Sequence, residues 1–333
     1  MLTVRLLPSL FLILLLSTTQ VIAAEPVAMA SWQDNAHSQR IKAFVKSVST
    51  EGSTDFVAPA DRIAVFDNDG TLWAEQPVYF QLYFALDQIK AMAKADPLLA
   101  QKWKKSPVFT AALSGDLKAI VGFGEKGLLE IVGTSHSGMT TDQFEQSVND
   151  WVNTARHPTT AKLFTKMVYQ PMLELLDHLR DNDFRIYIVS GGGIDFMRPW
   201  AERVYGIPKE NVIGSRLSTK YDNVDGTPVI MKEPKLEFND DKAGKPLAIH
   251  QFIGKRPILA VGNSDGDLQM LEWTATNTKP NMNVYIHHTD EIREWAYDSD
   301  SHIGKLKQGL IDAKKKNWLV VDMKADWLQV FPN

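Results

Sequence analysis

Short apolar runs rich in β-branched residues recur along the chain, and each ends in polar residues or glycine. Segments with helical spacing separate them, such as the one in which Leu173, Leu176 and Leu179 follow Pro171, a residue suited to a first helical turn. Strands that alternate with helices predict a doubly wound α/β fold with a mainly parallel, Rossmann-like sheet. The expected strands are 63–66, 185–189, 258–261, 284–287 and 318–321.

The first two expected strands are separated by more than a hundred residues, far more than one crossover helix needs. Residues 78–165 in this interval lack convincing strand patterns. They contain helical stretches at 79–93 and 144–154, and the second follows a capping-box pattern from Thr140 to Gln143. The expected domains are a helical cap at 78–165 and an α/β core at 25–77 and 166–333.

A second polar stretch, at 218–244, contains the pair Asp225-Gly226 followed by a β-rich run at 229–231. Asp-Gly between β-rich segments favours a tight turn between antiparallel strands. We therefore expect a small hairpin or a flexible flap in this stretch.

The first 24 residues have the pattern of a secretory signal peptide. A positive charge at Arg5 precedes an apolar run at 10–16, and small residues follow at Ala23 and Ala24. The run is shorter than the roughly 20 apolar residues that a membrane-spanning helix needs. We expect cleavage, export to the periplasm and no stable membrane span afterwards; an uncleaved anchor is the alternative.

Charge and composition narrow the classes of function. The 333 residues carry a formal net charge of -4, which argues against a nucleic-acid-binding surface. The chain contains no cysteine, so disulfides and thiol catalysis are excluded. The sequence does not indicate an oligomeric state.

The first expected strand leads into a pair of carboxylates. Asp67 follows the apolar run at 63–66, and Asp69 comes two residues later, before Gly70 and Thr71. Because side chains alternate along an extended strand, both carboxylates leave it on the same side. They can then divide catalysis between a nucleophile that also binds metal and a general acid and base. A loop of aspartates that caps a helix is the alternative.

Three later segments add groups with related chemistry. Ser190 and Gly191 follow the expected strand 185–189 and precede a helical stretch, where a hydroxyl and backbone amides suit a phosphate oxygen; a plain glycine turn has the same pattern. Lys245 stands at the start of a further helix. The strand at 258–261 leads into the loop 262–267, whose acidic and amide oxygens suit a hard cation.

The order of these motifs resembles the haloacid dehalogenase superfamily, in particular its phosphatases with a helical cap after the first motif, such as phosphoserine phosphatases. Four signatures fall in the expected order within residues 60–290, namely 67–71, Ser190 with Gly191, Lys245, and 262–267. The resemblance implies the fold of that superfamily, Mg²⁺ as cofactor and hydrolysis of a small-molecule phosphomonoester.

The resemblance also implies a role for each matched residue. Asp67 is expected to attack phosphorus and form an aspartyl-phosphate, while Asp69 protonates the leaving oxygen and then activates water. Ser190, Gly191 and Lys245 are expected to bind the transferring phosphoryl group. Dehalogenases need no acid at the second aspartate, so its presence favours phosphate esters.

The implied Mg²⁺ ligands are Asp67, the backbone carbonyl of Asp69, and Asn263, which stands where relatives place an aspartate. An amide oxygen binds a hard cation without contributing a charge, so we expect weaker binding unless Asp265 or Asp267 compensates. We expect Asn263 to bind directly and Asp267 to orient the ligands, with Asp265 less suited as a direct ligand.

The substrate is not indicated by the motifs. Phosphoserine phosphatases carry a glutamate five residues after the motif threonine, where this chain has Gln76, with Glu75 one place earlier. A dedicated phosphoserine enzyme is therefore not expected. A phosphotransferase that uses the same site and a non-catalytic exported binding protein stay open as alternatives.

Overall fold

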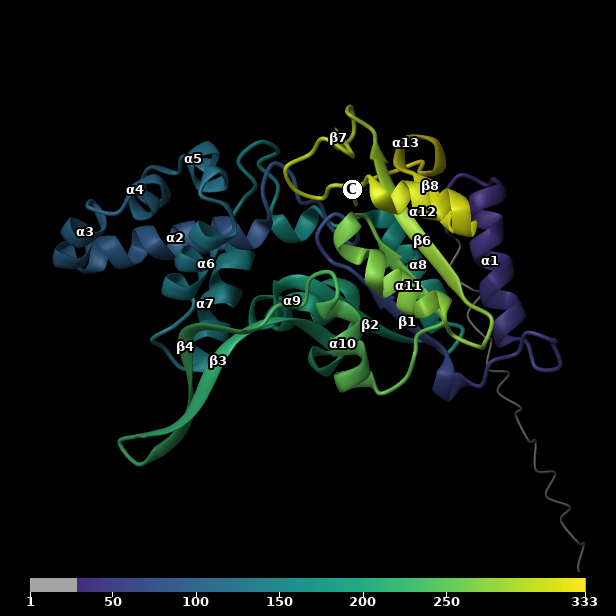
Figure 1. Cartoon of the computed structure of the whole chain (residues 1–333), viewed down its shortest axis with the longest axis horizontal. Helices are drawn as coiled ribbons and strands as arrows, with labels where there is room; N and C mark the ends of the chain where they lie inside the picture. Colours follow the sequence, from purple (N-terminus) through teal and green to yellow (C-terminus); the bar gives the residue numbers. More distant parts are fainter. Residues whose placement is uncertain (1–28, 333) are drawn as a thin grey trace, which may run out of the picture.

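The computed structural model describes residues 29–332, in which a parallel sheet carries helices on both faces (Figure 1). The parallel strands lie in the order β3-β2-β1-β5-β6-β8, with β4 antiparallel to β3 and β7 antiparallel to β6. The winding reverses at β1, and open α/β sheets bind ligands at such a switch point. The strands are β1 (Ile63–Phe66), β2 (Arg185–Gly193), β3 (Val212–Val224), β4 (Thr227–Phe238), β5 (Leu259–Gly262), β6 (Met282–Thr289), β7 (Ala296–Tyr297) and β8 (Leu319–Asp322).

Each face of the sheet has its own apolar layer. Ala64 and Phe66 of β1 belong to one buried cluster, and Ile63 and Val65 belong to the other. The alternation of side chains along a strand explains why this four-residue strand is buried on both faces. The first cluster includes residues of α1 (Ala36–Ser49), α8 (Gln170–Arg180), α9 (Ile194–Tyr205) and α13 (Met323–Asp326); the second includes residues of α10 (Gly244–Ala248), α11 (Leu268–Ala275) and α12 (Gln308–Lys316).

A helical region is inserted between β1 and α8, as predicted, and it lies to one side of the sheet in Figure 1. Most of its helices share a separate apolar cluster, whereas α7 contributes Phe144, Val148 and Trp151 to the main cluster. The predicted capping box of α7 is confirmed, since Thr140 and Gln143 exchange side-chain and backbone hydrogen bonds. The boundaries at 78 and 165 stay a prediction. The helices are α2 (Phe80–Ala95), α3 (Pro97–Trp103), α4 (Pro107–Ser114), α5 (Leu117–Gly122), α6 (Gly124–Ser135) and α7 (Thr141–Thr154).

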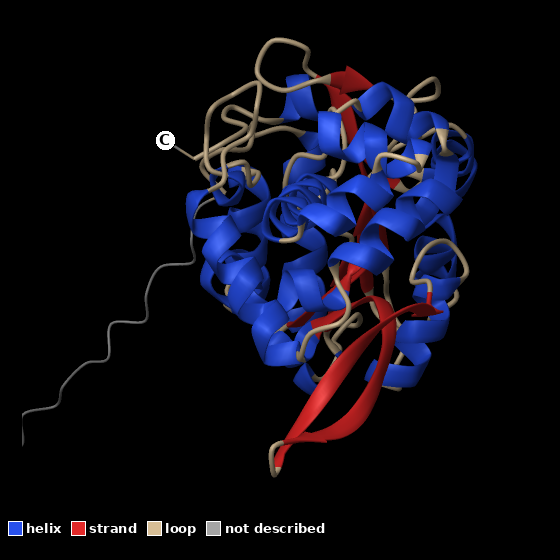
Figure 2. Cartoon of the chain, turned by 90° about the vertical axis from the view of Figure 1, so that its left-hand side faces the viewer, coloured by secondary structure: helices blue, strands red, loops and turns tan. Residues whose placement is uncertain are grey.

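Strands β3 and β4 form the predicted hairpin, which extends as a twisted arm (Figure 2). Its turn is Asp225-Gly226, where both residues have positive φ, of 51° and 84°. Nearer its base, Lys232 of β4 exchanges backbone hydrogen bonds with Gly138 and Met139, between α6 and α7. The hairpin therefore connects the sheet to the inserted helices.

The predicted signal peptide at 1–24 lies outside the described residues. Cleavage and export therefore stay predictions. Within residues 29–332, no helix combines the length and apolar character needed to cross a membrane.

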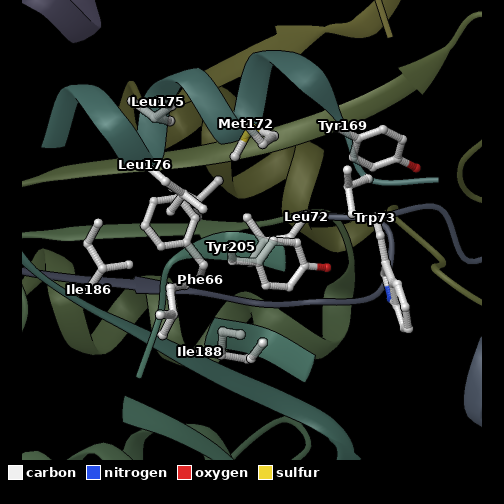
Figure 3. Close-up of a cluster of buried hydrophobic side chains, with 14 of the residues drawn as sticks. Phe66, Leu72, Trp73, Tyr169, Met172, Leu175, Leu176, Ile186, Ile188 and Tyr205 are labelled. Carbon is white, nitrogen blue, oxygen red and sulfur yellow. The ribbon is translucent and has the colours of Figure 1, made fainter. Parts of the chain in front are cut away.

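We predict that Leu176→Ala lowers the free energy of unfolding by roughly 2–5 kcal/mol, because a buried Leu loses both its transfer free energy and its packing. Leu176 of α8 is fully buried and lies beside Phe66 and the other side chains of the main cluster in Figure 3. Leu98→Ala is the matched control, because Leu98 in α3 is 77% exposed and its loss should cost no more than about 0.5 kcal/mol. Urea denaturation measures both; equal midpoints would contradict the described core.

Candidate active site

The loop after β1 turns sharply around Gly70. The Gly70 backbone has φ +75°, and its amide donates to the carbonyl of Trp73 over 2.8 Å. A Cβ at this position would lie 2.0 Å from Nδ2 of Asn263 and 2.4 Å from Oε1 of Glu75. Glycine is therefore required both for the backbone conformation and for the close approach of these two side chains.

Lys245 of α10 connects the first motif to the last. Its buried ammonium donates to Oδ1 of Asp67 at 2.6 Å and to the carbonyl of Val189 at 2.7 Å, and it pairs with Oδ1 of Asp267 at 2.7 Å. Burial opposes the charge of Lys245, but the carboxylates of Asp267, Asp67 and Asp240 outweigh it and raise its pKa. Lys245 is therefore charged at neutral pH and holds two aspartates together.

The two motif aspartates have different surroundings. Burial, together with the charge of Asp267, raises the pKa of Asp67 well above its ordinary value, and Lys245 opposes that rise. Burial also raises the pKa of Asp69, to about 6, against a 2.7 Å hydrogen bond from the indole of Trp73 and the charge of Lys245. A carboxyl with that pKa is partly protonated near neutral pH, as a general acid must be.

Ser190 lies beside the aspartates, although β2 continues past it. The strand was predicted to end at Val189, before Ser190 and the glycines, but it extends through Gly193 with a register shift after Ser190. The amide of Gly192 donates to Oγ of Ser190 at 3.1 Å, and a Cβ on Gly192 would lie 3.3 Å from both that Oγ and Oδ2 of Asp69. The Gly193 amide donates to Oε1 of Gln81 in α2 at 2.7 Å. Gly191 and Ser190 line the same pocket as Asp69.

The loop after β5 places Asn263 and Asp267 inside the site. Oδ2 of Asp267 accepts the backbone amides of Asn263 and Ser264, both at 3.0 Å, while its Oδ1 pairs with Lys245. Asn263 accepts from Thr71 at 3.3 Å through Oδ1. The carboxylate of Asp267 thus stabilises the loop that presents Asn263.

Asp265 lies apart from the other predicted site residues. Its carboxylate accepts the backbone amides of Lys307, Gln308 and Gly309, at 2.7–3.2 Å. These amides belong to the start of α12, whose N-terminal donors lack partners within the helix. Asp265 therefore caps the N-terminus of α12 from a loop that is distant in the sequence.

Glu75 is the residue that sequence reasoning noted without assigning a role. It is 1% exposed and accepts from Asn263 Nδ2 and from the Tyr297 hydroxyl, both at 2.7 Å and both through Oε1. Burial raises the pKa of Glu75 well above its ordinary value, and the charges of Asp69 and Asp67 add to that rise. The sequence could indicate Glu75 only as an acidic residue close to the first motif. Its contact with Asn263 depends on the fold.

A pocket of about 530 Å³ is lined by residues from the sheet and from the inserted helices. One wall is charged and polar and contains Asp67, Asp69, Glu75, Ser190 and Lys245. The lining from α2, α5, α6 and the hairpin also contains the charged residues Glu125, Arg216 and Lys232. Its aliphatic residues are Leu82, Val121, Leu128, Leu129, Val132, Leu217 and Leu236.

His136 also lines this pocket and is held in its neutral form. Burial and then the nearby charge of Lys232 lower the pKa of His136 to about 3. A neutral imidazole therefore adds no charge to this lining at physiological pH.

The donors around Asp67 suit a hard cation such as Mg²⁺, which prefers oxygen ligands. Asp67 and Glu75 offer carboxylates, Asp69 a backbone carbonyl and Asn263 an amide oxygen. In the described part of the chain, no three acidic or histidine side chains are grouped as a metal site by themselves. A cation here would therefore also need the amide and backbone oxygens.

Comparison with protein families identifies the chain. Residues 64–272 match the model of haloacid dehalogenase-like hydrolases, over more than half of the sequence. The chain belongs to this family. The resemblance predicted from the motifs is thereby confirmed, and the matched range includes Asp67, Ser190, Lys245 and Asn263.

Solved structures with a similar fold are distant in sequence. A conserved functionally unknown protein from Anaerococcus prevotii DSM 20548 has a TM-score of 0.53 and 15% identity, covering 89% of this chain and 94% of that chain. A protein with unknown function from Bordetella pertussis Tohama I has a TM-score of 0.47 and 14% identity over 79% and 99% of the two chains. A phosphoserine phosphohydrolase-like protein from Francisella tularensis subsp. tularensis SCHU S4 has a TM-score of 0.38 and 20% identity, covering 69% of this chain and 89% of that chain. A comparison with curated proteins gives no match.

We predict that Asp265→Ala lowers the free energy of unfolding by about 1–2 kcal/mol, because three amides at the start of α12 lose their acceptor. Asp265→Asn should cost less, since its single amide oxygen can still accept the two amides that Oδ1 accepts, those of Lys307 and Gly309, and only the Gln308 amide loses its acceptor. Urea denaturation of the metal-free protein measures both changes. An Ala variant as stable as the wild type would contradict the capping role.

Proposed function

We propose that the chain hydrolyses phosphomonoesters in a Mg²⁺-dependent reaction, with Asp67 as the nucleophile. The observation that carries this proposal is the arrangement of two unlike carboxyls on one pocket wall. Asp67 contacts the ammonium of Lys245, while Asp69, with a pKa of about 6, accepts a hydrogen bond from the neutral indole of Trp73. Such a pair suits a nucleophile beside a general acid. Export to the periplasm is a further part of the proposal and depends on residues 1–24.

The proposed reaction has two steps. In the first, an oxygen of Asp67 bonds to phosphorus, the bond from phosphorus to the ester oxygen breaks, and Asp69 gives its proton to that oxygen. In the second, Asp69 takes a proton from water, whose oxygen attacks phosphorus and releases Asp67. The hydroxyl of Ser190 and the ammonium of Lys245 stabilise the phosphoryl oxygens. Bound Mg²⁺ would lessen the repulsion between an anionic carboxylate and an anionic ester.

The pocket supports an ester whose organic group is apolar. The phosphoryl-binding groups lie on the polar wall, so the leaving group would extend toward the wall formed by the inserted helices and the hairpin. That wall contains several aliphatic side chains, and its His136 is neutral. An alkyl or aryl group would bury apolar surface against these aliphatic side chains.

We predict that the wild type releases phosphate from phosphomonoesters only with Mg²⁺ and that Asp67→Asn lowers kcat by roughly a thousandfold or more, because the amide is a poor nucleophile. Asp55→Asn is the matched control, since Asp55 is exposed in the loop after α1. Phosphate release from a panel of alkyl, aryl, sugar and amino-acid phosphates measures turnover. Absence of Mg²⁺-dependent turnover of every ester would overturn the proposal.

We predict that kcat/KM rises from methyl to hexyl phosphate and that Leu128→Ser lowers the hexyl value at least about tenfold, because an apolar contact is lost. The methyl value should change little, since a methyl group offers little apolar surface to bury. Steady-state kinetics with both esters measures this difference. Equal losses for both esters would contradict an apolar leaving-group site.

A further inference from the structure

The acidic loop that follows β5 leaves the expected cation site short of charge. Asp265 is occupied at the start of α12, and both carboxylate oxygens of Asp267 are engaged, one with Lys245 and the other with loop donors. Asn263 itself is neutral. No carboxylate of this loop therefore stands beside Asn263 without another partner.

Glu75 fills that position from a different segment. Its Oε1 lies 2.7 Å from Nδ2 of Asn263, and the two atoms meet above Gly70, where a Cβ would approach both more closely than real contacts allow. On the other side, a Cβ on Gly304 would lie 1.9 Å from the same Oε1. Two glycines thus leave room for one buried carboxylate directly against the amide of Asn263.

The remaining oxygen of Glu75 accepts no hydrogen bond from the part of the chain described by the structure, because both donors, Asn263 and Tyr297, contact Oε1. Glu75 also lines the pocket together with Asp67 and Asp69. A buried carboxylate with one oxygen unused, in the same pocket as two other carboxylates, is suited to a divalent cation.

We infer that Glu75 supplies to the Mg²⁺ site the negative charge that Asn263 lacks. The neutral amide and the adjacent carboxylate together replace the aspartate expected at residue 263. The inference rests on the proposed function for the identity of the cation, but it concerns binding and can be measured without turnover.

The test is calorimetric titration of Mg²⁺ into four proteins, namely the wild type, Glu75→Gln, Asn263→Asp and the double variant. Glu75→Gln keeps an oxygen that can accept from Asn263 and Tyr297 but loses the charge, so its Kd for Mg²⁺ should rise by roughly 10–100-fold. The double variant returns one charge to the site at residue 263, and its Kd should fall back toward that of the wild type. Glu130→Gln, on the exposed face of α6, is the matched control and should leave Kd unchanged.

The outcomes separate this inference from the proposed function. A Glu75→Gln protein that is folded by circular dichroism and binds Mg²⁺ as tightly as the wild type would overturn the inference, even if turnover is Mg²⁺-dependent. Weakened binding in Glu75→Gln with recovery in the double variant would support it, even if no ester is hydrolysed. A wild type that binds no Mg²⁺ would overturn it as well.

Discussion

The site depends on one buried ammonium. Lys245 lies within 2.7 Å of an oxygen of Asp67 and of Asp267, which come from the ends of different strands. Charges removed from water are costly unless they are paired, and Lys245 forms an ion pair with both carboxylates and a hydrogen bond with that of Asp67. Loss of the ammonium would leave two buried carboxylates in mutual repulsion. The two ion pairs of Lys245 therefore hold the end of β1, α10 and the loop after β5 next to one another.

The fold brings this cluster to a suitable edge of the sheet. β1 lies between β2 and β5, so the residues that follow these three strands meet at the point where the winding reverses. The apolar layers on both faces of β1 exclude water. The resulting low dielectric strengthens the electrostatic interactions of the charges at the end of β1. The shifted pKa values of Asp67 and Asp69 have burial as their largest cause.

The pocket combines two surfaces with different chemistry. The sheet contributes charged groups that suit a phosphate ester, and the inserted helices with the β3-β4 hairpin contribute aliphatic side chains. The hairpin connects to the insertion through the backbone bonds of Lys232, so both parts of this lining are held against the sheet together. Two segments far apart in sequence therefore decide what the site can accommodate beyond the phosphoryl group.

The sequence alone determined the strands at the centre of the sheet, the helical insertion and the capped start of α7, because these follow from local periodicity, backbone propensity and side chains within one helical turn. It also placed Asp67, Asp69, Ser190 and Lys245 on strand or helix ends. The tertiary structure decided how those ends combine: that β2 runs on to Gly193, that Asp265 caps α12 across 42 residues, and that Glu75 contacts Asn263. These contacts join residues distant in the chain, and the space that permits them depends on packing that no local pattern encodes.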